Sequence, residues 1–195
     1  MATQGQVDPK AALELYAWNA EISGALLFPL HVCEVAIRNA VAEVLETIHG
    51  EHWPREQAFK RLLHKKMRDD LQTAANKAGN TTSKVIPELT FSFWQHMFTS
   101  RYDSRIWNKY LHDVLPNLPP GQSISEPRAK INDHLERVRI LRNRIAHHEP
   151  IFKRNLQDDY DTILRLVGWR CQFTADWMDE HQRVRHILGK SPLLR

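Results

Sequence analysis

The sequence predicts an all-α fold, a helical bundle of four main helices with one or two shorter helices. Leu, Ala, Glu, Arg and Lys dominate the composition, and these residue types favour helices. Only seven glycines occur and β-branched alternation is scarce, so a sheet is not expected. The 195 residues suit one domain, residues 1–195, with a core of about residues 8–181 and a tail, 182–195, that we expect to be loose.

The charge and the cysteine content indicate what kind of partner and which cellular compartment to expect. The formal net charge is +4 and the sequence pI is about 9.2, which suits a polyanionic partner without requiring one. Cys33 and Cys171 each lie in an apolar helical pattern outside any CxxC pair, so we expect buried free thiols in a reducing compartment. The N-terminus resembles neither a signal nor a transit peptide, and no apolar run looks long enough to span a bilayer. We therefore expect a cytoplasmic protein that does not enter a membrane.

The first half of the chain is expected to hold three helices. Asp8 and Pro9 have the pattern of an N-cap followed by proline at the first helical position. The apolar residues of this first helix recur at helical spacing at Leu13, Tyr16, Ala17 and Ala20. Gly24 or Pro29 is expected to break or kink it. A second helix, with a stripe at Val32, Val35, Ala36, Asn39 and Ala40, should stop at Gly50. A third, basic helix spans about residues 55–79, and the sequence NTTSK after it reads as a loop.

The second half begins with a segment dense in aromatic residues and ends with two long helical patterns. The aromatic residues, which indicate core or subunit contact, are Phe91, Phe93, Trp94, Phe98, Tyr102, Trp107 and Tyr110. After a proline-rich loop, Ser125 is expected to cap a helix. The core-facing stripe of this helix is Ile131, Leu135, Val138, Leu141 and Ile145. The last long helix should run from about residue 155 to residue 180.

The stretch LRNRIAHHEPIF, residues 141–152, is the most informative part of the sequence. Pro150 pushes the residue before it away from helical angles, so the helix should end near His147 or His148, before Glu149. Arg142 adjoins the core stripe, so we expect it to be less exposed than Arg137 or Arg144. On an unbroken helix Arg142 and His147 diverge by about 140°, whereas Asn143 and His147 share a face. Either the helix end turns the histidine back, or a second copy of the helix supplies the other half of a site on the axis of a symmetric dimer.

These residue types suit RNA cleavage without a metal or cofactor. Arginine presents a planar fork of donors to phosphate oxygens, histidine transfers protons near neutral pH, and asparagine orients either partner. A base removes the proton of a ribose 2′-OH, which attacks the adjacent phosphorus, and an acid protonates the leaving 5′-oxygen. DNA lacks the 2′-OH, so this reaction is closed to it. The plainer interpretation is a helix C-terminus at which cations cap free carbonyls.

The motif also resembles that of a known family. RNRIAH fits the R-x4-H motif, with a polar residue after the arginine, of the HEPN superfamily of small helical RNases. Three blocks, YAWNAEISGALLFPLHVCEVAIRNAV, LTFSFWQHMFTSRYDSRIW and LRNRIAHHEPIF, resemble the Abi-like (abortive infection) branch over about residues 13–170. The resemblance implies an HEPN-like helical homodimer, metal-independent cleavage of RNA such as tRNA or mRNA, and a role in phage defence or as a toxin. By position, Arg142, Asn143 and His147 take the family's catalytic roles.

Two features depart from the family pattern. HEPN toxins silenced by a nucleotidyltransferase antitoxin often carry a tyrosine two residues after the motif histidine, and this chain has Glu149 there. That partnership is therefore not expected, which leaves another antitoxin or a phage trigger as the candidate partner. Many Abi-like chains are also longer than this one, so an accessory region is expected to be missing.

Four further residues are candidates for substrate binding: Glu34, Arg38, Arg144 and His148. Glu34 and Arg38 lie four apart on a largely apolar helix, where they either line the cleft or form an internal ion pair. The basic run over residues 60–68 is best read as a solvated helix face, although it also suits an RNA backbone. His181 and His186 lack a zinc ligand set, and His31 with Cys33 supplies only two ligands, so we expect no metal site.

Two other functions fit the same residues. The bundle can be a non-catalytic dimeric module that binds RNA or protein, which salt-sensitive binding to RNA that stays intact would indicate. A nucleotide-sensing domain that uses Arg142 for a phosphate is the third reading, although no glycine-rich phosphate loop supports it.

Overall fold

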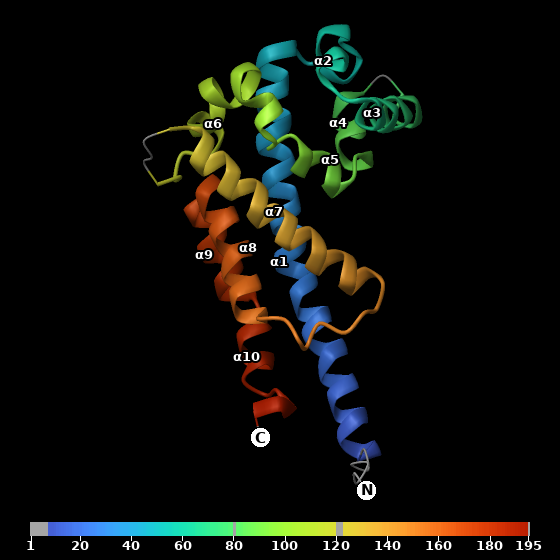
Figure 1. The fold of residues 1–195 in the computed structure, drawn as a ribbon, viewed down its shortest axis with the longest axis vertical. Helices are drawn as coiled ribbons and strands as arrows, with labels where there is room; N and C mark the ends of the chain where they lie inside the picture. The colour runs from blue at the N-terminus through green and yellow to red at the C-terminus, as the bar shows by residue number, and fades with distance from the viewer. Residues whose placement is uncertain (1–7, 80, 120–122, 195) are drawn as a thin grey trace, which may run out of the picture.

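The all-α prediction is confirmed. The structure is a computed structural model that describes residues 8–79, 81–119 and 123–194, and these residues contain no strand (Figure 1). The α-helices in chain order are α1 (Pro9–His49), α2 (Gln57–Leu62), α3 (Lys65–Lys77), α4 (Thr82–Val85), α5 (Phe91–His96), α6 (Asn108–Val114), α7 (Ser125–Ala146), α8 (Leu156–Arg170), α9 (Gln172–His181) and α10 (Val184–Leu188). Short 3-10 turns occur at Trp53–Arg55, Ile86–Glu88, Ser100–Tyr102 and Pro192–Leu194, and a π-helical turn at Asp103–Trp107.

Helix α1 is one continuous helix of 41 residues, so the expectation that Gly24 or Pro29 interrupts it is wrong. The Asp8 carboxylate accepts a hydrogen bond from the Lys10 backbone N–H (2.9 Å), which confirms the N-cap. Pro29 costs the helix one backbone hydrogen bond. Its ring is buried, and α1 beyond its exposed N-terminal end packs against other helices (Figure 1), so burial outweighs that cost.

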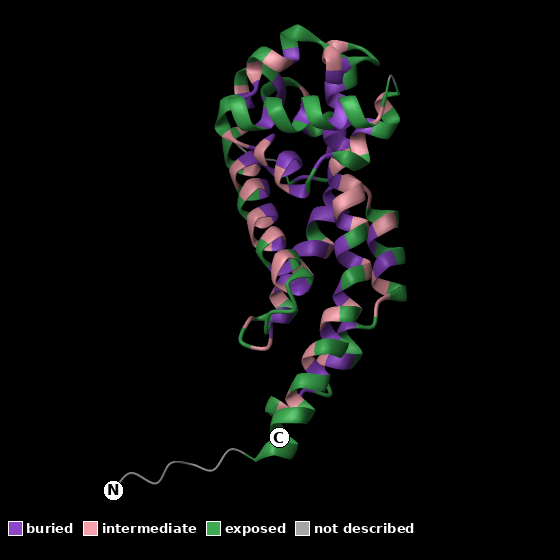
Figure 2. Ribbon diagram, turned by 90° about the vertical axis from the view of Figure 1, so that its right-hand side faces the viewer, coloured by how far each residue is buried: buried purple, intermediate pink, exposed green. Residues whose placement is uncertain are grey.

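The buried face of α1 differs from the predicted one near its N-terminus. Leu13, Tyr16, Ala17 and Ala20 are all exposed, and the core contacts there come instead from the adjacent stripe that begins at Trp18. Helix α10 covers that stripe, and the indole N–H of Trp18 donates to the Ile187 carbonyl oxygen (2.9 Å). The exposed N-terminal end of α1 is visible in Figure 2. The predicted loose tail thus contains a short helix that packs against α1.

By length and composition, α1 is long and apolar enough to cross a membrane, contrary to the sequence expectation. One 18-residue window of this helix has a mean hydropathy of 1.5. A core helix of a soluble protein has the same properties, and α1 packs against α5, α6, α8 and α10. The feature therefore does not place the chain in a membrane.

Two expected helices are broken by extended residues. The basic helix divides into α2 and α3 at Leu63 and His64, whose ψ angles are 143° and 164°. The last helix divides into α8 and α9 at Cys171 (φ −157°, ψ 110°). Part of the expected NTTSK loop forms α4, beyond Asn80, which lies outside the described residues. Ser125 is the first residue of α7 rather than its cap.

The aromatic segment forms part of the hydrophobic core, as its density predicts. Phe93, Trp94, Phe98 and Trp107 are all buried. The rings of Phe98 and Trp107 stack with centroids 4.4 Å apart. The predicted stripe of α7 is buried at all five positions. These contacts fix α7 across α1, which determines where the arginine–histidine motif lies.

A buried carboxylate joins α7 to α8. Asp159 is 1 % exposed and accepts hydrogen bonds from Arg137 Nε (2.6 Å) and from Arg154 Nε and Nη2 (2.8 and 2.9 Å). Arg137 also bonds to Asp158, at the more exposed edge of the cluster. Arg137 is therefore a structural residue, which its position on the helix did not reveal.

Candidate active site

Helix α7 ends in a turn that orients the two histidines. His147 is the C-cap residue, and His148 follows it with a φ angle of +57°. The His148 N–H donates to the Ile145 carbonyl oxygen (3.1 Å), and the Glu149 N–H donates to the Arg144 carbonyl oxygen (2.8 Å). This pair of bonds is a Schellman motif. The prediction that the helix ends before Glu149 is confirmed.

His148 is the only described non-glycine residue with a positive φ angle. Glycine is the usual residue at this position, because a Cβ is strained there. His148→Gly should therefore raise the free energy of unfolding in urea by about 1 kcal/mol. The control His147→Gly, at φ −96°, should give no gain because no such strain exists to relieve. If the two variants were equally stable, the backbone at His148 would not be strained.

The segment after the motif is tied back to the helices. Arg144 Nη1 donates to the Pro150 carbonyl oxygen (3.2 Å), and Arg144 Nε lies 3.9 Å from the Glu149 carboxylate. The Ile151 N–H donates to Asn19 Oδ1 of α1 (2.8 Å). The segment crosses α1 on its way to α8 (Figure 1). Arg144, a candidate for substrate binding, thus makes bonds within this turn.

One cleft collects part of the predicted site. Glu34 of α1 and Arg142 and Asn143 of α7 line a cleft of about 630 Å³. Arg142 and Asn143 are consecutive residues of α7. Among the described residues, neither side chain makes a hydrogen bond or ion pair to the protein. Both are free to bind a ligand, and the volume lies in the range typical of ligand sites.

The other predicted residues lie outside the lining of this cleft. His147 is exposed and, like Arg142, its side chain makes no hydrogen bond to the described residues. Of the two alternatives for Glu34 and Arg38, Glu34 lines the cleft, whereas Arg38 is half-buried outside its lining, with its Nε buried and without a hydrogen-bond partner among the described residues. Arg142 is exposed whereas Arg137 and Arg144 are half-buried, which reverses the expected order. The reversal arises because Arg137 and Arg144 bind groups of the protein.

Four charged residues of the cleft were missed by the sequence reasoning. Lys66 and Asp70 of α3 line it together with Glu88, and Arg139 precedes Arg142 by one helical turn. Lys66 belongs to the basic run that was interpreted as a solvated face. Its spacing from Asp70, four residues on one helix, is the only sequence signal that the two share a surface. No local sequence pattern indicates that α3 and α7 line the same cleft.

A second hollow lies on the other side of the motif. His148, Ile145 and Ala146 border a cavity of about 410 Å³ against the N-terminal half of α1. Tyr16 and Leu27 line it and are 74 % and 55 % exposed. With Leu13 (70 % exposed), they form an apolar stripe along α1, of which Tyr16 and Leu27 lie beside the end of α7. Within one chain, Arg142 and His148 therefore open into different hollows.

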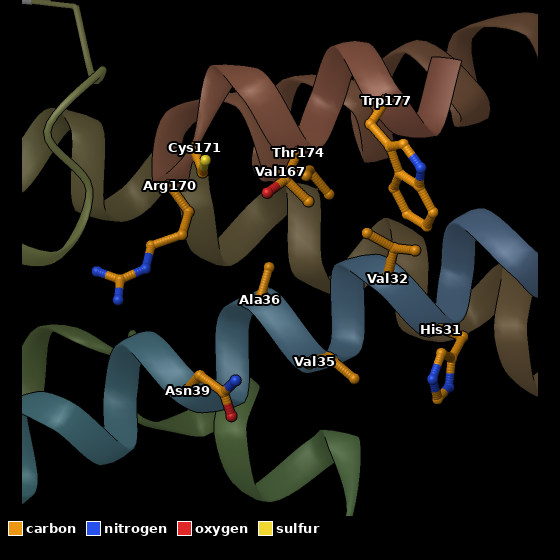
Figure 3. Close-up of a pocket in the computed structure, with 10 residues that line it drawn as sticks. All are labelled: His31, Val32, Val35, Ala36, Asn39, Val167, Arg170, Cys171, Thr174 and Trp177. Carbon is orange, nitrogen blue, oxygen red and sulfur yellow. The ribbon is translucent and has the colours of Figure 1, made fainter. Parts of the chain in front are cut away.

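A third cavity, of about 380 Å³, contains none of the predicted site residues. In Figure 3, Val32 and Ala36 of α1 face Thr174 and Trp177 of α9 across it. Four of the five residues of the stripe predicted for the second helix thus line this cavity, and the fifth, Ala40, lies in the core. Cys171, expected to be buried, is half-buried, and hydrogen bonds from Thr174 lower the pKa of its thiol.

The described residues contain no group of three or more His, Cys, Asp or Glu side chains placed to hold a metal ion. Comparison of the chain with protein-family models, with curated proteins and with solved structures finds no significant match. The geometry of the cleft and of the motif is therefore the basis for assigning a function.

Proposed function

We propose that this protein is a metal-independent endoribonuclease, an Abi-like member of the HEPN superfamily that acts as a homodimer. The observation that carries the proposal is that Arg142 and Asn143 line the same cleft. Neither side chain bonds to another protein group among the described residues. His147, five residues later, stands exposed at a fixed helix end. An unpaired guanidinium and an exposed imidazole are the groups that phosphodiester cleavage needs.

The proposed chemistry requires no group beyond protein side chains and water. Arg142 binds the scissile phosphate and stabilises the charge that builds on its oxygens. His147 acts as the general base, takes the proton of the ribose 2′-OH, and lets O2′ form a bond to phosphorus. The P–O5′ bond breaks, and the leaving O5′ takes a proton from His148 or from solvent. The products are a 2′,3′-cyclic phosphate and a 5′-hydroxyl. Asn143 orients the phosphate or the imidazole.

A second copy of the chain completes the site in this proposal. Arg142 opens into the cleft beside α3, whereas the motif's second histidine opens toward α1. A two-fold axis near the end of α7 brings Arg142 of one protomer toward His147 of the partner subunit. Tyr16 and Leu27 of the apolar stripe lie beside that end, and a dimer would remove them from water.

The biological role follows from the class of protein proposed. Cleavage of cellular tRNA or mRNA in the cytoplasm would stop growth, as a toxin or an abortive-infection protein does. The net charge of +4 suits an RNA substrate. An antitoxin would inhibit the activity until it is needed, or a phage component would trigger it.

The test is cleavage of a labelled RNA oligonucleotide in EDTA. The wild-type protein should cleave it at the same rate with and without EDTA, and the products should end in a 2′,3′-cyclic phosphate. A matched oligonucleotide with a single 2′-deoxy sugar should resist cleavage at that position. Activity that disappears in EDTA, or cleavage at the 2′-deoxy position, would contradict the mechanism.

The alternative function is a dimeric module that binds RNA or protein without cleavage. The separation of Arg142 and His148 into different hollows within one chain favours it. It predicts that RNA binds, stays intact, and loses affinity steeply as salt increases.

A further inference from the structure

Arg139 enters the cleft beside Arg142 and is held in place by the protein. Arg139 Nε and Nη2 donate to the two oxygens of Glu136, at 2.9 and 2.6 Å. Gln95 of α5 donates to the same carboxylate (2.7 Å). These bonds lower the pKa of Glu136, so the carboxylate stays charged. Glu136 therefore fixes one edge of the Arg139 guanidinium.

The other edge of Arg139 is available to a ligand. A guanidinium has five N–H donors, and Glu136 takes two of them. The remaining three, including both on Nη1, have no partner among the described residues. Since Arg139 and Arg142 lie three residues apart on α7, their side chains project side by side. Such a pair can reach neighbouring phosphates of one strand.

Lys66 adds a third cation from another helix, α3. It is exposed on α3, lines the same cleft, and makes no ion pair with the described residues. The cleft also holds the carboxylates of Glu34, Asp70 and Glu88. Glu88 is paired with Lys77 (2.5 Å), which leaves Glu34 and Asp70 as acceptors for ribose hydroxyls or base amino groups. This mixture of charges suits an unpaired strand, whose sugars and base edges are accessible.

We propose that Arg139 and Lys66 form a second phosphate-binding subsite beside Arg142, so that the cleft holds at least two phosphates of single-stranded RNA. The inference rests on the proposed function for its choice of ligand. Arg139 and Lys66 bind and position the strand, and Arg142 holds the phosphate that reacts. Glu136 and Gln95 position Arg139.

The probe is a fluorescent 2′-O-methyl oligouridylate, which can bind but cannot be cleaved by 2′-OH attack. Its dissociation constant is measured by anisotropy over a series of salt concentrations. Lys66→Ala and Arg139→Ala should each weaken binding at low salt by about 3- to 10-fold. Each should also reduce the slope of log affinity against log salt by about 0.7. Lys66→Arg should bind as the wild type does, because it keeps the charge.

Lys65→Ala is the matched control, since Lys65 is also exposed on α3 but does not line the cleft. It should bind as the wild type does. If Lys66→Ala and Arg139→Ala also bind as the wild type does, or if the wild type does not bind the probe, the subsite is wrong. Cleavage of ordinary RNA is scored separately. If RNA stays intact but the variants show the predicted binding defects, the subsite proposal stands and the nuclease proposal is wrong. If RNA is cleaved but the variants bind as the wild type does, the nuclease proposal stands and the subsite proposal is wrong.

Discussion

Arg142→Ala and His147→Ala should nearly abolish RNA cleavage while leaving the protein as stable as the wild type. Loss of the general base should reduce the rate by about 10²- to 10⁴-fold. Loss of the arginine should reduce it by about 10²- to 10³-fold. Both side chains are exposed and make no hydrogen bond to the described residues, so the free energy of unfolding should change by less than about 0.5 kcal/mol.

The measurement is initial cleavage rate on one labelled RNA, with urea unfolding of each variant beside it. Arg105→Ala and His112→Ala are matched controls, because both residues are exposed and lie outside the cleft and the motif. The controls should cleave at the wild-type rate. If Arg142→Ala or His147→Ala cleaves as fast as the controls, the proposed roles of these residues are wrong.

Asp159→Asn should cause a large loss of stability. The carboxylate is 1 % exposed and bridges Arg137 and Arg154, whose side chains are 33 % and 21 % exposed. An amide offers one acceptor oxygen and no charge, so Arg154 loses its counter-ion and Arg137 keeps only the more exposed Asp158. Breaking a buried ion pair costs about 3–5 kcal/mol, and partial solvation of the arginines places the expected loss near 3 kcal/mol.

Asp158→Asn is the control for this prediction. Asp158 bonds to the same arginine but is 49 % exposed, so its loss should cost less than about 1 kcal/mol. Urea unfolding at neutral pH compares the two variants with the wild type. Equal losses for Asp158→Asn and Asp159→Asn would show that burial does not control the energetics of this cluster.

Local patterns predicted the buried face and the C-terminal end of α7 correctly. Its stripe of five apolar residues faces the core, and Pro150 places the helix end before Glu149. Both features depend on neighbours in the sequence, namely helical period and the restriction before proline. The aromatic segment was predicted for the same reason, since so many large rings must be buried somewhere.

The errors on α1 come from tertiary packing. Pro29 has the local properties of a helix breaker, yet α1 continues because other helices pack against it. Helix α10 covers the stripe that begins at Trp18, whereas Leu13 and Tyr16 stay exposed. No local pattern contains that information.

The predictions for the candidate site also succeeded where local patterns determine the outcome and failed where tertiary packing does. Arg142, Asn143 and Glu34 were identified from the motif and from the family resemblance, and they share a cleft. Lys66 and Arg139 were missed because their presence there depends on the relative placement of α3 and α7. Arg144 and Arg137 were misjudged because their partners, Pro150 and Asp159, are set by turns that follow the helix.

The central claim is that Arg142 of one chain and His147 of its partner make one site for RNA cleavage. Co-expression of Arg142→Ala and His147→Ala chains with different tags allows the mixed dimer to be purified by two affinity steps. In that dimer one of the two composite sites regains both residues, so cleavage should recover to roughly half the wild-type rate while each variant homodimer stays inactive. A mixed dimer as inactive as the two homodimers would contradict the claim.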